Sequence, residues 1–305
     1  MAEPIIKWAG GKRQLLDAIR SRIPQEYDRY FEPFFGGGAV FFSLEPRNGY
    51  INDINPRLMN FYEQVRSNTE SLISESKKLD SEFRKYESGR AGEEDSSGED
   101  FYYAKREEFN SLREDGECRD KLREAVLFLF LNRYCFNGLY RENEEGEFNV
   151  PIGSKPTPVA AIESRIHRAR RVLYETEIST EDFRYVREYV EEDDLVFLDP
   201  PYPAQSRTAQ FNEYGEGGFG EENQKAVRDL AIELHERGAY VLITNGEPAL
   251  DLYDGEMPDD FRIIPLDGKR RINSDASKRE GIGTTDILIT NSPAFSEQVS
   301  LDEYR

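Results

Sequence analysis

The sequence predicts an α/β protein with a doubly wound sheet and a mostly helical insertion. Short apolar segments alternate with glycine turns and amphipathic helices at both ends of the chain, as in α/β proteins. Several of these segments end on an acidic residue, at the edge where open α/β sheets bind ligands. Residues 56 to about 120 instead carry charged, helix-period sequence without clear strands. We therefore expect one domain at residues 1–55 and 163–305, and an insertion at 56–162.

The N-terminal part begins the predicted sheet. Tyr30–Phe35 is a short apolar strand, followed by the turn Gly36-Gly37-Gly38 and the helical run AVFFSL. Gly49–Asn52 is a second strand that closes on Asp53. The strand, glycine turn and helix in this order are typical of the first unit of a doubly wound sheet.

The insertion contains one strongly apolar helix and two loops. Lys121–Tyr134 (KLREAVLFLFLNRY) is the helix, and Phe136–Val150 is predicted as a β-hairpin because Gly138 and Gly146 can supply its turns. Residues 88–100 carry five acids, one Arg and no strong apolar anchor. Such a composition does not offset its ordering entropy, so we expect a mobile acidic loop there.

Alternation of strands and helices resumes in the C-terminal part. Asp194–Leu198 (DLVFL) is a buried strand ending at Asp199, and Glu221–Arg237 is an amphipathic helix that stops at Gly238. Further strands are predicted at Ala239–Thr244, Phe261–Pro265 and Thr285–Thr290.

Composition excludes several classes of protein. The 305 residues include two cysteines (Cys118, Cys135) and two histidines (His167, His235), too few for a disulfide framework or a dedicated zinc centre. No apolar run reaches the ~20 residues that span a bilayer, and the start MAEPIIKWAGGK lacks the apolar stretch of a signal peptide. We expect a cytoplasmic protein without a bound metal.

The formal charge of −20 excludes a diffuse positive coat as the means of meeting nucleic acid. The cations are 29 Arg and 11 Lys. Excess carboxylate with scarce lysine suggests a halophile-like protein, because molar salt shortens the screening length to ~3 Å and reduces self-repulsion. An ordinary acidic protein is the alternative.

The glycine turn and Asp53 suit a nucleoside ligand. Gly36, Gly37 and Gly38 let backbone approach a ligand closely. Phe41 stands where a dinucleotide fingerprint needs its third glycine, which disfavours a nicotinamide enzyme. Asp53 can bind the two hydroxyls of a ribose. It can equally cap the helix that begins near Pro56.

The segment Asp199-Pro200-Pro201-Tyr202, directly after LVFL, is the strongest chemical signal in the chain. Its prolines fix the backbone and remove two donors, leaving carbonyls free to accept hydrogen bonds. A carboxylate and a proline-held carbonyl can accept both hydrogens of a base amine, localising its lone pair for attack, while Tyr202 stacks on the ring. A proline-stiffened loop capped by Asp199 is the structural alternative.

Six segments in order resemble the Dam-type family of DNA adenine methyltransferases (the D12 class, alpha-type amino-methyltransferases), over nearly the whole chain. KWAGGKRQLL resembles its N-terminal motif, FEPFFGGGAVFF its S-adenosylmethionine loop and NDIN its ribose-binding acid. NRYCFNGLYR with EFNVPIG resembles its recognition hairpin, DPPY its catalytic motif, and RRINSDASKR with TDILITN its C-terminal segment.

The resemblance implies a catalytic domain with the sheet of S-adenosylmethionine-dependent methyltransferases, and a target-recognition insertion. It implies in-line transfer of a methyl group from S-adenosyl-L-methionine to the exocyclic amine of adenine in duplex DNA, without a general base. Asp199, Pro200 and Tyr202 would hold the adenine. The implied cofactor residues are Trp8, Gly10, Lys12, Phe35, Gly36, Gly38, Asp53, Asp182, Phe183 and Asp199.

The adenine amine lies inside the duplex, so the base must be flipped out. Phe136 can wedge into the gap, Asn137 can bond the orphaned partner base, and Leu139 can press on the stack. Arg141 can contact guanine in the major groove, worth ~1–3 kcal/mol of discrimination. Further DNA-contact positions are Lys7, Pro151, Lys155, Arg270, Arg271, Lys278 and Arg279. The implied target is GATC.

Two departures and several alternatives stand beside this hypothesis. Phe136 occupies a position where relatives commonly carry Tyr, and Lys155 one that is often aromatic. An RNA adenine or DNA cytosine amino-methyltransferase would need the same acceptor geometry. A catalytically silent DNA-binding regulator on the same fold is the alternative from another class. We expect a monomer, with or without a partner restriction endonuclease.

Overall fold

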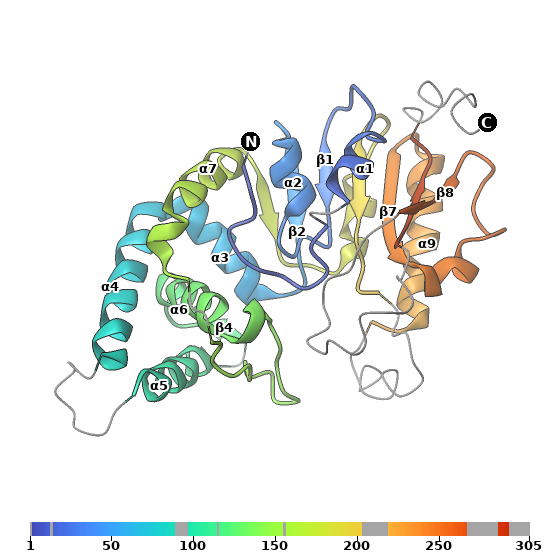
Figure 1. The fold of residues 1–305 in the computed structure, drawn as a ribbon. Helices are drawn as coiled ribbons and strands as arrows, with labels where there is room; N and C mark the ends of the chain where they lie inside the picture. The colour runs from blue at the N-terminus through green and yellow to red at the C-terminus, as the bar shows by residue number, and fades with distance from the viewer. Residues whose placement is uncertain are drawn as a thin grey trace, which may run out of the picture. The chain divides into compact units, whose positions relative to one another are not determined.

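The computed structural model describes residues 2–12, 15–88, 97–114, 116–154, 157–202, 219–266 and 286–292 (Figure 1). The chain divides into two compact units. The first comprises residues 1–11, 36–47 and 52–180, and the second comprises residues 12–35, 48–51 and 181–305.

The second unit is built on a mixed, mostly parallel sheet. Strands β2, β1, β6 and β7 are parallel neighbours in that order, followed by β9, which is antiparallel to both β7 and β8. The bounds are β1 (Tyr30–Glu32), β2 (Gly49–Asn52), β6 (Leu195–Leu198), β7 (Tyr240–Gly246), β8 (Arg262–Leu266) and β9 (Asp286–Thr290). The predicted α/β class is thereby confirmed, and this mostly parallel sheet fits a methyltransferase fold.

Short helices and one long helix accompany this sheet. They are α1 (Leu16–Arg20), the 3-10 helices η3 (Phe183–Glu188) and η4 (Glu247–Leu252), and α9 (Glu221–Glu236). Helix α9 buries Val227, Leu230 and Leu234 in the core that also holds Val196 and Leu198 of β6. All four residues of β6 are buried, as in strands covered on both faces. Its carboxyl end therefore projects Asp199 from a rigid core.

The first unit is mostly helical (Figure 1). It contains α2 (Ala39–Leu44), α3 (Pro56–Ser67), α4 (Thr69–Glu87), α5 (Gly98–Ser111), α6 (Lys121–Tyr134) and α7 (Glu163–Leu173). Shorter elements are β3 (Arg113–Glu114), β4 (Glu117–Cys118), η1 (Phe136–Gly138), η2 (Val159–Ala161) and β5 (Glu177–Ser179). Every residue of α6 from Glu124 to Tyr134 is buried, and α3, α4 and α5 pack against it. A helix that is apolar on all sides is the centre of such a bundle.

The start of α5 corrects one prediction. Residues 98–100, expected to belong to a mobile acidic loop at 88–100, instead form the start of α5, because Ser97 and Asp100 form a reciprocal capping box that begins the helix. Residues 89–96 lie outside the described residues.

The predicted hairpin at Phe136–Val150 is not confirmed. Its arms are antiparallel and share backbone hydrogen bonds, such as Phe136 N to Pro151 O at 2.8 Å and Asn149 N to Arg141 O at 3.1 Å. They pair through the isolated bridges Cys135–Ile152 and Glu142–Phe148, not as strands. The first arm starts as the 3-10 turn η1, in which Asn137 has φ 56° and Gly138 has φ 68°. Left-handed backbone of this kind does not continue a strand. We call residues 136–151 the recognition loop.

Within the described ranges, no helix is both long and apolar enough to cross a membrane. The same part of the chain contains no group of three or more His, Cys, Asp or Glu side chains arranged to hold a metal ion.

Candidate active site and recognition loop

In the first unit, the glycine turn that follows β1 packs closely against Trp8. Gly36 and Gly38 have φ values of 50° and 64°, which side chains rarely adopt. A Cβ at Gly36 would lie 2.7 Å from Trp8 Cδ1, and one at Gly37 would lie 3.1 Å from Trp8 Cβ. Glycine is therefore required at position 36 by both conformation and space.

Asp53 is bound to this turn and does not cap the helix that follows. Its carboxylate accepts hydrogen bonds from the N–H of Gly36 at 2.9 Å and of Asn55 at 3.0 Å. The cap of α3 is Asn55, whose side chain accepts from Arg57 N and Leu58 N. The alternative that Asp53 is a helix cap is wrong, because the chain needs two more residues before it turns into α3.

Burial raises the pKa of Asp53, and the two backbone N–H groups act in the opposite direction by stabilising its charge. Its neighbour Ile54 is 72% exposed, a large apolar side chain in solvent beside a half-buried carboxylate. Sequence reasoning missed Ile54. The available signal was an apolar residue directly after the acid that ends a strand.

In the second unit, Asp199 follows β6 and lies against a buried lysine. Lys12 Nζ is 2.6 Å from Asp199 Oδ1, and the Thr244 hydroxyl donates to the same oxygen at 2.8 Å. The side chains of Lys12 and Asp199 are 6% and 19% exposed. Burial raises the pKa of Asp199, while the Lys12 ammonium and the Thr244 hydroxyl oppose that shift. The carboxylate is thus fixed in position, and its contacts with Lys12 and Thr244 favour the ionised form against the cost of desolvation.

The loop that carries Asp199 is fixed by contacts from two other elements. Gln224 of α9 donates to the carbonyl of Pro201 at 2.6 Å and accepts from Asn245 of β7 at 2.9 Å. Lys12 Nζ lies 4.5 Å from the centre of the Tyr202 ring. A Cβ at Gly246 would lie 3.2 Å from the same ring. Thr244, Gln224 and Gly246 were missed from the sequence, where nothing near DPPY points to them.

The pair Asp182 and Phe183 lies at the start of η3. Asp182 caps this 3-10 helix by accepting from Arg184 N at 3.0 Å. The Phe183 ring is 5% exposed and stacks on Phe34, with centroids 5.0 Å apart. Phe219 approaches both rings, at 5.6 and 5.9 Å. Phe35, the predicted cofactor residue, is buried, and nothing in the sequence distinguishes it from its neighbour Phe34.

The recognition loop presents apolar and polar side chains together. Phe136 and Leu139 are 46% and 40% exposed, among the few large apolar side chains in solvent, and Asn137 and Arg141 are also exposed. Arg141 Nε donates to Asn149 Oδ1 at 2.6 Å, which holds the guanidinium against the other arm.

Asn132 anchors this loop to the N-terminal segment. Its amide accepts from Lys7 N at 3.0 Å and donates to Lys7 O at 2.7 Å and to Gly138 O at 3.3 Å. Gly138 packs under the Lys7 side chain, where a Cβ would come within 2.5 Å of Lys7 Cδ. Pro151 O accepts from Phe136 N at 2.8 Å. These contacts bring Lys7, Phe136 and Pro151 together.

The remaining predicted residues divide into two groups. Gly10 is exposed with φ 75°. Lys155, Arg270, Arg271, Lys278 and Arg279 lie outside the described residues.

A family model matches almost the whole chain. Residues 8–272 match the D12 class of N6 adenine-specific DNA methyltransferases. The chain belongs to this family and is a site-specific, adenine-specific DNA methyltransferase, as the resemblance indicated.

Individual relatives agree with the family. The chain is 35% identical to "Type II methyltransferase M.MjaIII" of Methanocaldococcus jannaschii over 95% of its length and 99% of the relative. It is 33% identical to "DNA adenine methylase" of Haemophilus influenzae over 90% of both chains. It is also 36% identical to "DNA N-6-adenine-methyltransferase" of Escherichia phage P1, over 90% of this chain and 34% of the phage protein.

Proposed function

We propose that the protein transfers a methyl group from S-adenosylmethionine to the exocyclic amine of adenine in duplex DNA, within GATC. The observation that carries this proposal is the Asp199 carboxylate, held by Lys12 and Thr244 at the end of β6 and followed by a proline-stiffened loop. A rigid acceptor of this kind suits the amine of a flat base, and the family is adenine-specific.

The residues present fit the cofactor. The turn at Gly36 is closed by Trp8 so tightly that a Cβ does not fit, and Asp53 stands at its edge with an exposed apolar neighbour. We propose that Asp53 binds the ribose hydroxyls and Ile54 contacts the base. Gly10, Gly38, Lys12, Phe35, Asp182 and Phe183 complete the proposed cofactor residues. When bound, S-adenosylmethionine supplies a methyl group already activated on a sulfonium, so no general base is needed.

Asp199 and the loop after it act on the adenine. Within the described part of the chain, the contacts from Lys12 and Thr244 both fall on Oδ1 of the carboxylate, and we propose that Oδ2 accepts a hydrogen from the target amine. The carbonyl of Pro200 accepts the second hydrogen, and Tyr202 stacks on the ring. Two acceptors localise the lone pair of the nitrogen as it attacks. Lys12 keeps Asp199 ionised and oriented.

The recognition loop is the proposed DNA-binding element of an insertion spanning 56–162. Phe136 enters the space left by the flipped adenine, Asn137 bonds the partner base, and Leu139 packs on the stack. Arg141 reads guanine in the major groove. Lys7, Pro151, Lys155, Arg270, Arg271, Lys278 and Arg279 are the further proposed DNA contacts. A monomer that methylates each strand in turn is sufficient.

Transfer of tritiated methyl to matched oligonucleotides tests the function. A duplex containing GATC should be labelled on adenine, and duplexes with scrambled sites, RNA of the same sequence and cytosine-only sites should not. Label on RNA or cytosine would assign the acceptor to another class. DNA binding without any transfer would favour a regulatory protein.

Two substitutions separate chemistry from recognition. Asp199→Ala should lower turnover by about 10²–10³-fold with nearly unchanged cofactor affinity, since one acceptor is lost. Arg141→Ala should relax discrimination at the guanine more than it weakens overall affinity. A uniform loss of affinity across sequences would make Arg141 a phosphate contact instead.

A further inference from the structure

One residue of the recognition loop points away from the proposed DNA-binding side. Leu139 and Arg141 are exposed, whereas Tyr140 between them is half-buried and packs inward. Its ring stacks on Trp8, with centroids 5.3 Å apart and an interplanar angle of 27°. The loop therefore touches the segment that closes the glycine turn.

Tyr140 is held from several directions. Its ring also packs against Phe128 of α6 at 5.7 Å and Phe148 of the opposite arm at 5.5 Å. Its hydroxyl donates to Glu142 and hydrogen-bonds the side chain of Asn55, the cap of α3. Burial raises the pKa of Tyr140 above the ordinary value of a tyrosine, so the phenol stays protonated and can donate.

A continuous set of contacts thus runs from the loop to the proposed ribose acid. Tyr140 stacks on Trp8, and Trp8 fills the space beside Gly36, leaving no room for a Cβ. Gly36 N in turn donates to Asp53. On the hydroxyl side, Asn55 lies two residues after Asp53 and donates its own N–H to that carboxylate. Tyr140 reaches Asp53 through both.

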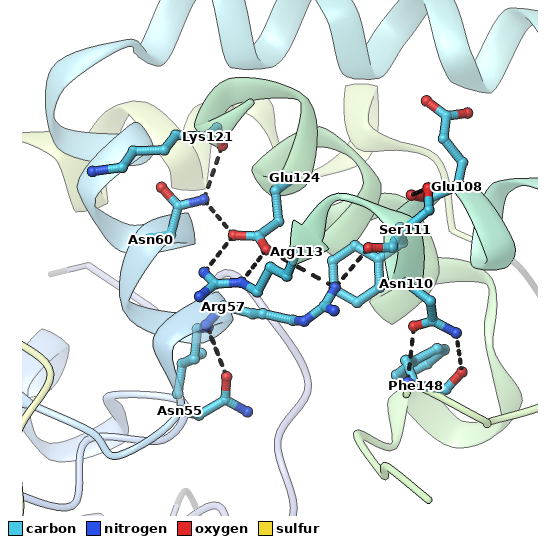
Figure 2. Close-up of polar contacts among 12 residues, drawn as sticks. Asn55, Arg57, Asn60, Glu108, Asn110, Ser111, Arg113, Lys121, Glu124 and Phe148 are labelled. Carbon is cyan, nitrogen blue, oxygen red and sulfur yellow. Dashed lines mark hydrogen bonds and ion pairs between the residues drawn. The ribbon is translucent and has the colours of Figure 1, made fainter. Parts of the chain in front are cut away.

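The surroundings of Tyr140 are rigid on the protein side. Figure 2 shows the Glu124 carboxylate with Arg57 of α3 and Arg113 gathered about it, and the Asn110 amide pairing with the backbone of Phe148. Asn110 donates to Phe148 O at 3.1 Å and accepts from Phe148 N at 2.9 Å. The first turn of α3 and the second arm of the loop are therefore fixed to helices α5 and α6.

The first arm is held more weakly. Between the anchored positions it has an isolated bridge and a few backbone hydrogen bonds, such as Asn149 N to Arg141 O at 3.1 Å, in place of a strand ladder. Residues 141–147, which lead from this arm through the turn, are largely exposed. A segment with few buried contacts and an exposed backbone can become ordered or disordered at a low cost in free energy. A ligand that orders this arm also fixes Tyr140 against Trp8.

We propose that Tyr140 is a positioning residue that couples binding at the recognition loop to binding at the glycine turn. DNA held by Phe136 to Arg141 orders the first arm, which restrains Tyr140 in its stack on Trp8 and keeps the turn at Gly36 in the form that binds S-adenosylmethionine. The cofactor strengthens DNA binding by the same factor, because such coupling is reciprocal. This inference rests on the proposed function.

Trp8 makes the coupling directly measurable, since it is the single tryptophan of the chain. Its fluorescence is recorded while the wild-type protein is titrated with GATC duplex, with S-adenosylmethionine, and with each in the presence of the other. We expect the duplex alone to change the Trp8 emission. It should also lower the Kd for the cofactor by about 5- to 150-fold, the usual range of coupling between two sites.

Variants at position 140 separate the ring from the hydroxyl. In Tyr140→Leu the duplex should change the Kd for the cofactor by less than about twofold, because the stack on Trp8 is lost. Tyr140→Phe keeps the ring and should retain most of the coupling. Tyr134→Leu is the matched control. It removes a buried tyrosine of α6 whose ring stacks on Phe130, with centroids 4.3 Å apart, and it should leave the coupling unchanged.

Each outcome bears on one claim. Full coupling in Tyr140→Leu, or equal loss in Tyr134→Leu, overturns the role of Tyr140. If the wild-type protein methylates GATC but the duplex changes neither its Trp8 emission nor its affinity for the cofactor, the coupling is wrong and the proposed function stands. A protein that neither binds nor methylates duplex DNA overturns the proposed function itself. If Tyr140→Leu does not fold, the wild-type titration still tests whether the coupling exists, and Tyr140→Phe still tests the part played by the hydroxyl.

Discussion

Replacing Glu124 by glutamine removes the charge of a completely buried carboxylate at the centre of the helical unit. The side chain is 0% exposed. Arg113 donates to it from both Nε and Nη2, the latter at 2.8 Å, and Asn60 donates at 2.7 Å. Arg57 Nη1 lies 3.9 Å away (Figure 2). Two guanidinium groups therefore depend on this one negative charge.

The expected loss of stability follows from that geometry. In Glu124→Gln the amide NH2 faces a guanidinium donor, and the buried Arg57 and half-buried Arg113 lose their counter-ion. Breaking a buried pair in this way costs about 3–5 kcal/mol. That is a large part of the roughly 5–15 kcal/mol by which domains are stable. At about 2–4 °C per kcal/mol, the melting temperature should fall by roughly 6–20 °C.

Urea denaturation followed by tryptophan fluorescence measures this effect, because Trp8 lies in the same unit as Glu124. Glu75→Gln is the control. It breaks the exposed pair with Lys78, whose side chains are 43% and 64% exposed, and should change stability by less than about 1 kcal/mol. A loss below about 1 kcal/mol for Glu124→Gln would refute the reasoning, since the guanidinium groups would then be solvated without the carboxylate.

Three further outcomes are expected. Gly36→Ala should lower the stability of the fold by about 1–2 kcal/mol from its φ of 50° alone, and its Cβ should displace Trp8. Cofactor affinity, measured by equilibrium dialysis, should therefore fall much more in Gly36→Ala than in Gly37→Ala, and equal affinities in the two variants would contradict this. Burial raises the pKa of Asp199, so the acceptor is ionised only above that raised value. Methyl transfer should therefore fall on the acid side at a higher pH than an ordinary aspartate predicts. Lys12→Met removes the charge that opposes the shift and should move the acid limb of the pH–rate profile further up, so an unmoved limb would exclude the pair. With a formal charge of −20, the free energy of unfolding should rise from 0.1 M to molar potassium chloride, and a flat series would leave an ordinary acidic protein.

The elements with the strongest local patterns were predictable from sequence. The apolar run Lys121–Tyr134 forms α6 with the predicted bounds, and the strand LVFL ends where Asp199 begins. Both patterns involve side chains only a few residues apart, so the elements they predict depend less on tertiary contacts than a loop does. The recognition loop shows the limit of this reasoning: glycine turns suggested a β-hairpin, but the left-handed backbone of Asn137 starts a 3-10 turn instead.

The partners of the candidate site residues were not predictable. Nothing in the sequence indicates that Lys12 pairs with Asp199, or that Gln224 fixes the backbone of Pro201. Glu124 illustrates the same point, because a charged residue in an apolar helix gives no sign that two arginines from other elements neutralise it. Such pairs join residues far apart in the chain.

The sequence by itself determined the α/β class, the family and the motif residues at the glycine turn and after β6, because these depend on residue type and local spacing. Only the tertiary structure decided that Asp53 binds the turn instead of capping α3, and that Tyr140 packs on Trp8 while its neighbours face solvent. The physical reason is that hydrogen bonds and ring stacking of this kind form only after packing has brought distant segments within a few ångströms of one another.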